Sequence, residues 1–79
     1  MELEVLKEAI ESVLMVYEKE IHLDSVFLGD LGADSIDLMQ IFQICEERLG
    51  ISTDPAKAEE VVTVQDALNL ILEAKGNES

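Results

Sequence analysis

A serine flanked by acids stands at the predicted start of a helix. Asp34, Ser35 and Asp37 follow a glycine-containing segment and open a run of residues with helical periodicity. Asp34 is well placed as the N-cap of this helix, because its carboxylate can accept the free amide protons of the first turn. Ser35 then begins the helix with its hydroxyl open to an incoming group. This placement is compatible with chemistry at Ser35, and an ordinary serine in the first turn of a helix is the alternative explanation.

The other reactive residue types do not support catalysis at this serine. A serine nucleophile needs a second group to activate it, and the only histidine, His22, has no distinctive partner motif. The only cysteine, Cys45, falls on the apolar side of the predicted helix, whereas a reactive thiol needs an accessible and electropositive setting. The aspartates near Ser35 lack the alternating spacing of a calcium loop. We expect neither enzymatic activity nor a dedicated metal site.

The composition describes one small acidic domain. The 79 residues suffice for a single domain with a modest core, ordered over about 3–74 with a frayed C-terminal tail. Hydrophobic residues make up 48% of the chain and aromatics only 4%, so the core must consist mainly of aliphatic side chains. A single cysteine and the absence of a targeting segment favour a reducing cytoplasm. We expect a cytoplasmic monomer.

The net charge restricts the possible partners. Eighteen acidic residues against five basic ones give a formal charge of −13. A field of this sign repels nucleic acid and anionic membranes, and it attracts proteins that carry a positive patch. We therefore expect protein partners, and neither nucleic acid nor a membrane.

Helical periodicity predicts an all-α four-helix bundle with three long helices, one short helix and a long loop after the first helix. The expected helices cover about residues 3–18, 35–49, 55–60 and 63–74, and the loop covers 21–33. Caps mark several of these boundaries: Gly50 ends the second helix, Asp54 and Pro55 start the short one, and Thr63 with Asp66 opens the last. The side chains expected to face inward are Leu3, Leu6, Ile10, Val13, Leu14 and Tyr17, then Val26, Phe27, Leu28 and Leu31 in the loop, Leu38, Ile41, Phe42, Cys45 and Leu49 in the second helix, and Val64, Ala67, Leu68, Ile71 and Leu72 in the last.

The outward face of the second helix has the composition of a docking surface. Ile36 and Met39 lie on this face near the start of the helix, where a purely structural helix gains little from two exposed apolar side chains. Polar and acidic residues surround them, and the candidate partner-binding residues are Asp34, Ile36, Asp37, Met39, Gln40, Gln43, Glu46 and Glu47. Exposed hydrophobic side chains of no special function, or contacts with the loop, are the alternative explanation.

The run from Leu31 to Leu38, Leu-Gly-Ala-Asp-Ser-Ile-Asp-Leu, closely resembles the modification motif of acyl carrier proteins. In that family an Asp-Ser-Leu core follows a loop and opens the second helix. The later run from Thr63 to Leu68, Thr-Val-Gln-Asp-Ala-Leu, also agrees, and the resemblance covers nearly all of residues 3–73.

This resemblance implies a non-catalytic carrier. It implies that a phosphopantetheinyl transferase attaches 4′-phosphopantetheine to Ser35 as a phosphodiester, and that the thiol of this arm holds acyl groups as thioesters. The partners implied are that transferase and acyl synthase or transferase enzymes with basic docking patches. Asp34 and Asp37 match acidic residues that meet such patches, and the aspartate at the position of Asp34 helps to hold a metal ion in the transferase complex.

Three departures from the family pattern bear on the pathway. Ile36 replaces the usual leucine, Gln40 stands where an acid is common, and Gln43 occupies a place that is often apolar. The segment between Ile51 and Val64 is also about two residues longer than usual. The pathway is therefore either fatty-acid biosynthesis or a related, polyketide-like or specialised one. An aminoacyl or peptidyl carrier, and an acidic helical adaptor without a prosthetic group, remain as alternatives.

Overall fold

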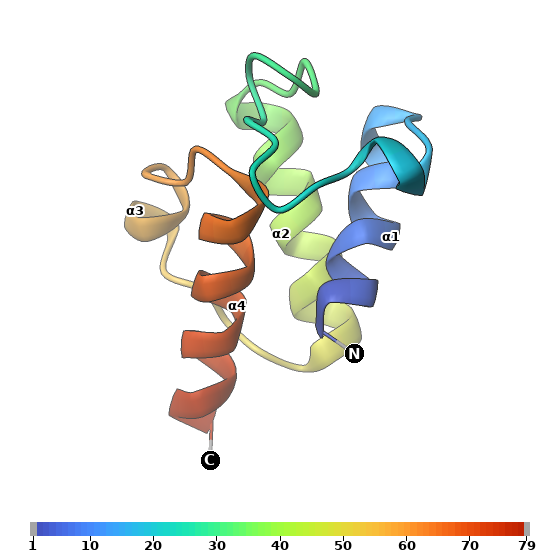
Figure 1. Ribbon diagram of the computed structural model, residues 1–79. Coiled ribbons are helices and arrows are strands. Elements are labelled where there is room, and N and C mark those ends of the chain that lie inside the picture. The colour runs from blue at the N-terminus through green and yellow to red at the C-terminus, as the bar shows by residue number, and fades with distance from the viewer. Residues whose placement is uncertain (1, 79) are drawn as a thin grey trace.

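The computed structural model describes residues 2–78, and it shows an all-α bundle (Figure 1). The elements in chain order are α1 (Glu2–Leu14), the 3₁₀ helix η1 (Glu18–Glu20), α2 (Ser35–Leu49), α3 (Pro55–Ala58) and α4 (Val64–Glu78). Helices α1 and α2 lie side by side and run in opposite directions, while the short α3 lies on the far side of α4 from α1. The predicted class, three long helices and one short helix with a long first connection, is confirmed.

The first helix ends earlier than the periodicity predicted. We expected it to reach residue 18, but α1 ends at Leu14 and Met15 adopts a left-handed backbone with φ of 59°. The Met15 amide still donates to the Glu11 carbonyl at 2.9 Å, which completes the last turn. The Glu20 carboxylate then accepts the Tyr17 amide proton at 3.1 Å and helps to start η1. Tyr17 is consequently exposed, and its predicted place in the core is wrong.

Local capping sets the boundaries of the other helices, as predicted. Gly50 ends α2 with a left-handed φ of 65°, and the Asp54 carboxylate accepts the Ala56 amide proton at 2.9 Å at the start of α3. Thr63 Oγ1 accepts the Asp66 amide proton at 3.1 Å, while the Asp66 carboxylate accepts the Thr63 amide proton at 3.1 Å. The predicted capping pair at the start of α4 is therefore confirmed. Helix α3 is two residues shorter than expected and ends at Ala58.

The C-terminal helix extends into the segment that we expected to fray. Helix α4 includes Lys75, which forms an ion pair with Glu2 of α1. Ser79 lies outside the described residues. Fraying of this tail stays a prediction.

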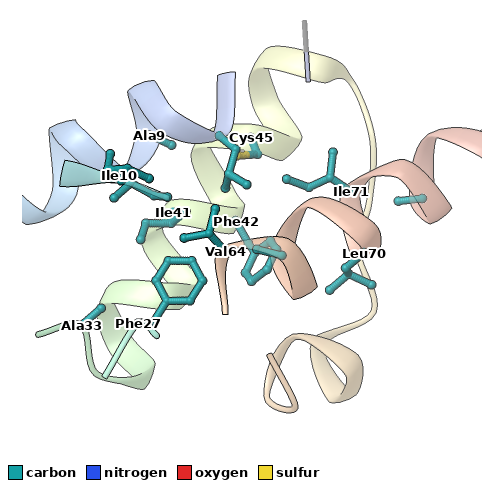
Figure 2. Close-up of a cluster of buried hydrophobic side chains, with 14 of the residues drawn as sticks. Ala9, Ile10, Phe27, Ala33, Ile41, Phe42, Cys45, Val64, Leu70 and Ile71 are labelled. Atoms are coloured by element: carbon teal, nitrogen blue, oxygen red, sulfur yellow. The ribbon is translucent and has the colours of Figure 1, made fainter. Parts of the chain in front are cut away.

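The core joins all three long helices and the loop before α2 (Figure 2). Its fully buried large side chains are Leu6, Ile10, Phe27, Ile41, Cys45, Val64 and Ile71. Phe27 is the only one of these that comes from a loop, and its ring points into the space between the helices.

Besides Tyr17, two further expected core residues face solvent, so their predictions are wrong. Leu28 is exposed because its neighbour Phe27 takes the inward position in the same turn. Leu72 is exposed because the buried face of α4, which includes the predicted Val64, Ala67 and Ile71, continues through Leu70 and Ala74 on the side away from Leu72.

Among the described residues, three ion pairs join different pairs of helices. Arg48 of α2 donates to Glu8 of α1 at 2.6 Å. Lys57 of α3 pairs with Glu73 of α4, and Lys75 of α4 pairs with Glu2 of α1. Apart from the Glu2 side chain, which is 20% exposed, the paired side chains are about half exposed, so these ion pairs contribute little to stability and apolar burial remains the main stabilising term. None of the helices described is long and apolar enough to cross a membrane.

Candidate functional site

Ser35 is the first residue of α2, and two aspartates fix the backbone around it. Asp34 Oδ1 accepts the Asp37 amide proton at 3.0 Å, and Asp37 Oδ2 accepts the Asp34 amide proton at 3.4 Å. The Leu38 amide donates to the Asp34 carbonyl at 3.0 Å. Ser35 itself is exposed. The predicted N-cap is confirmed. Asp37 also contributes to the cap by accepting the Asp34 amide proton, and the sequence analysis did not predict this bond.

The loop before α2 holds Ser35 in place through Phe27. The Ala33 amide donates to the Phe27 carbonyl at 2.8 Å, so the segment leading to Ser35 is bonded directly to a residue anchored in the core. Asp30 closes the turn in between, because its carboxylate accepts the Val26 amide proton at 2.7 Å. Gly32 has a left-handed φ of 69°, a conformation that glycine adopts at least cost. The start of α2 is thus an ordered platform.

The same loop is bonded to the start of α4. The Phe27 amide donates to the Val62 carbonyl at 2.9 Å, and the Val64 amide donates to the Ser25 carbonyl at 3.0 Å. Ser25 is buried, and its hydroxyl accepts the His22 amide proton at 3.0 Å. Segments that are distant in sequence therefore position the loop, and none of these bonds was visible in the sequence pattern.

The face of α2 that we expected to point outward is exposed at most of its positions, and its role in docking stays a prediction. Ile36 and Met39 are 64% and 69% exposed. Gln40, Gln43 and Glu47 are also exposed, while Asp37 is half-buried. These residues therefore present a mixed apolar and polar surface beside Ser35.

Glu46 differs from the other residues of this face. Its Oε2 accepts both the amide proton of Thr53, at 2.9 Å, and the hydroxyl proton of Thr53, at 2.5 Å. The side chain thereby ties α2 to the loop that leads into α3. Glu46 has a structural role, in addition to the partner contact that we predicted for it.

A groove of about 870 Å³ lies between α2 and α3, with Ser35 among its lining residues. Leu38, Phe42 and Ala58 contribute apolar wall, and Gln40 and Gln43 contribute amides. Sequence analysis missed this groove. The only available signal was a short helix capped by Asp54 and Pro55, which gives α2 a neighbour on this side.

The Ser35 hydroxyl and the Cys45 thiol lie in different surroundings, one exposed and one buried. Within the part of the chain that the structure describes, no side chain is hydrogen-bonded to the Ser35 hydroxyl, and no three histidine, cysteine or acidic residues form a metal-binding group. Cys45 is fully buried, and burial raises the pKa of its thiol to about 11. The thiol is therefore protonated near neutral pH, and it acts as core packing, as predicted.

The sequence is similar to known proteins over most of its length. A family model described as the phosphopantetheine attachment site matches residues 4–71. The chain is 38% identical over 73 residues to an acyl carrier protein of Solidesulfovibrio magneticus, covering 92% of this chain and 94% of the relative. It is 42% identical over 66 residues to an acyl carrier protein of Treponema pallidum, covering 84% and 85%, and 41% identical over 68 residues to one of Clostridium perfringens, covering 86% and 90%.

Proposed function

We propose that this chain, which belongs to the phosphopantetheine-binding acyl carrier protein family, holds acyl groups as thioesters on a 4′-phosphopantetheine arm attached to Ser35. Membership of this family makes the chain a non-catalytic carrier whose cofactor is phosphopantetheine. Residues 1–79 act as a single carrier domain, since one hydrophobic core includes residues of all three long helices.

The position of Ser35 is the observation that carries this proposal. Ser35 is an exposed residue at the first position of the 15-residue helix α2, and the N-cap Asp34 holds this end of the helix in place. A helix N-terminus presents unpaired amides and a partial positive charge, which suits the phosphodiester formed on this residue. The site therefore fits the group chemically.

The groove beside Ser35 suits a flexible apolar cargo. When bound, the phosphopantetheine arm supplies the thiol on which an acyl group is held. The apolar wall formed by Leu38, Phe42 and Ala58 offers cover for the cargo next to the attachment point. Glu46 keeps this wall in place through its bonds to Thr53.

The exposed face of α2 supports a role in presenting the arm to other proteins. Its partners are a phosphopantetheinyl transferase and acyl synthase or transferase enzymes with basic docking patches. Ile36 and Met39 supply apolar contacts, while Asp37 and Glu47 steer association through their charge. Asp34 and Gln40 border the attachment point, and Gln43 and Glu46 continue the surface along α2.

Exposed amides on this surface support a specialised pathway over housekeeping fatty-acid synthesis. Gln40 and Gln43 line the groove, so they face the space that cargo and partners share. Intact mass of the protein isolated from its own cells identifies the cargo, because arm and acyl group add defined increments. A simple saturated acyl group alone would contradict specialisation.

The attachment site is tested by Ser35→Ala, with Ser52→Ala as a matched control at another exposed serine. Each purified protein is incubated with coenzyme A and a phosphopantetheinyl transferase, and its intact mass is measured. We expect one phosphopantetheine group on the wild type and on Ser52→Ala, and none on Ser35→Ala. Circular dichroism should show equal helix content in all three. Modification of a folded Ser35→Ala protein would refute the assignment.

A further inference from the structure

Most of the exposed large hydrophobic residues lie on segments near the end of the bundle that carries Ser35. Of the eight large hydrophobic residues that are exposed in the described part of the chain, only Leu72 lies well down a helix from this end. Figure 1 shows the C-terminal end of α1, the N-terminal end of α2 and the start of α4 toward the same side of the molecule. Ile36 and Met39 belong to the α2 surface already described. The remaining five lie on segments outside α2, and they are Met15, Tyr17, Leu23, Leu28 and Val62.

Three of these residues are the most exposed of the set. Met15, Leu28 and Tyr17 are 86%, 73% and 71% exposed. Met15 and Tyr17 follow the end of α1, and Leu28 lies in the loop that leads to α2. Since folding gains almost nothing from these side chains, their exposure is explained better by binding than by stability.

Ordered backbone presents these side chains. The Met15 amide is bonded to Glu11, and the Tyr17 amide is bonded to the carboxylate of Glu20. Leu28 lies in the turn that Asp30 closes through its bond to the Val26 amide. Because the backbone is already held, a partner that covers these residues orders their side chains but little further backbone.

The charge of this end identifies the kind of partner. Residues 15–40 contain six carboxylates and a single basic residue, Lys19, whose ammonium group lies 6.0 Å from the centre of the Tyr17 ring. A second copy of this chain would bring like charges together, and the negative field also opposes an anionic membrane. An enzyme with apolar pockets and a cationic rim is the complementary surface.

We propose that the enzymes acting on Ser35 or its arm contact a second apolar site formed by Met15, Tyr17 and Leu28, in addition to the outward face of α2. This inference rests on the proposed carrier function. A partner that makes both contacts covers the whole end of the bundle that carries Ser35, and the arm projects from within the covered surface.

The test uses arm attachment by the transferase that modifies the wild-type protein, with coenzyme A and a range of carrier concentrations. The variants are Met15→Asn, which tolerates the left-handed backbone, and Leu28→Ser. Leu72→Ser is the matched control, because it removes an exposed leucine away from this end. We expect KM to rise on the order of 5-fold for each of the first two variants, with kcat unchanged. Leu72→Ser should match the wild type.

The outcomes separate this inference from the proposed function. If the wild type is modified on Ser35 but all variants have the wild-type KM, the second contact site does not exist while the carrier function stands. If the wild type is not modified, the carrier function itself fails. Sedimentation of the unmodified protein adds a further check: a dimer that Leu28→Ser dissociates would assign this surface to self-association and overturn the inference. Melting temperatures of the variants within about 2 °C of the wild type ensure that the comparison concerns binding.

Discussion

The cap at Asp34 has two separable functions, one structural and one electrostatic. Its carboxylate accepts the Asp37 amide proton at 3.0 Å, and it also places negative charge directly before Ser35. Asparagine caps a helix about as well as aspartate, whereas alanine does not cap at all. Asp34→Asn therefore removes the charge alone, whereas Asp34→Ala removes both the charge and the cap.

The expected magnitudes follow from the size of the chain. Loss of an N-cap side chain costs about 1 kcal/mol. An unfolding entropy of roughly 2.1 cal/mol/K per residue gives about 0.17 kcal/mol/K for 79 residues. Asp34→Ala should therefore lower Tm by about 6 °C, while Asp34→Asn should change it by less than about 2 °C. Asp37→Ala should cost less than Asp34→Ala, because its reciprocal bond is long at 3.4 Å.

Thermal unfolding followed by circular dichroism measures the structural part, and the rate of arm attachment measures the electrostatic part. We expect both Asp34 variants to be modified more slowly than the wild type at low salt, because both lack the charge. Equal Tm values for Asp34→Ala and the wild type would refute the capping argument. A fall in Tm for Asp34→Asn as large as that for Asp34→Ala would show that charge, and not the hydrogen bond, stabilises the helix start.

Two further predictions concern the loop and the start of α4. Phe27→Ala should lower the free energy of unfolding by about 3–5 kcal/mol, a large part of the roughly 4–12 kcal/mol typical of a chain of this length, because it empties a fully buried site. Urea titration measures this, and a loss under 1 kcal/mol would mean that the loop is not anchored by this ring. The amides of Thr63 and Val62 donate to Asp66 and lower the pKa of its carboxyl below the usual 3.8. The ionised carboxylate therefore stabilises the fold fully above pH 3.8, and this stabilisation is lost as pH falls through the lowered pKa. Asp66→Asn should therefore destabilise the protein most near neutral pH, and a Tm difference from the wild type that persists undiminished at pH 2 would contradict this cause.

The structure accounts for how a small domain can be both a stable scaffold and a presenting surface. Phe27 and the bonds between its loop and the start of α4 anchor the segment that precedes Ser35. On the outward face of α2, the structural bonds are the capping bonds between Asp34 and Asp37 and those that Glu46 makes to Thr53. Ser35 therefore stands on a rigid base beside a surface available to partners.

The sequence alone determined the features that depend on residues close together in the chain. The cap at Asp34, the helix end at Gly50 and the capping pair of Thr63 and Asp66 each involve groups no more than four residues apart, so local pattern reveals them. The helical class follows from the same short-range periodicity. Ser35 was also identifiable, because its motif is contiguous.

Only the tertiary structure decided the features that depend on which distant groups meet. The backbone turns left-handed at Met15, although the apolar period continues to Tyr17, and this change ends α1. Leu28 faces solvent because Phe27 beside it enters the core, a choice that periodicity cannot make inside a loop. The groove and the bond between Glu46 and Thr53 exist only because α3 packs beside α2. Packing and long-range hydrogen bonds are properties of the whole fold, so no window of the sequence contained them.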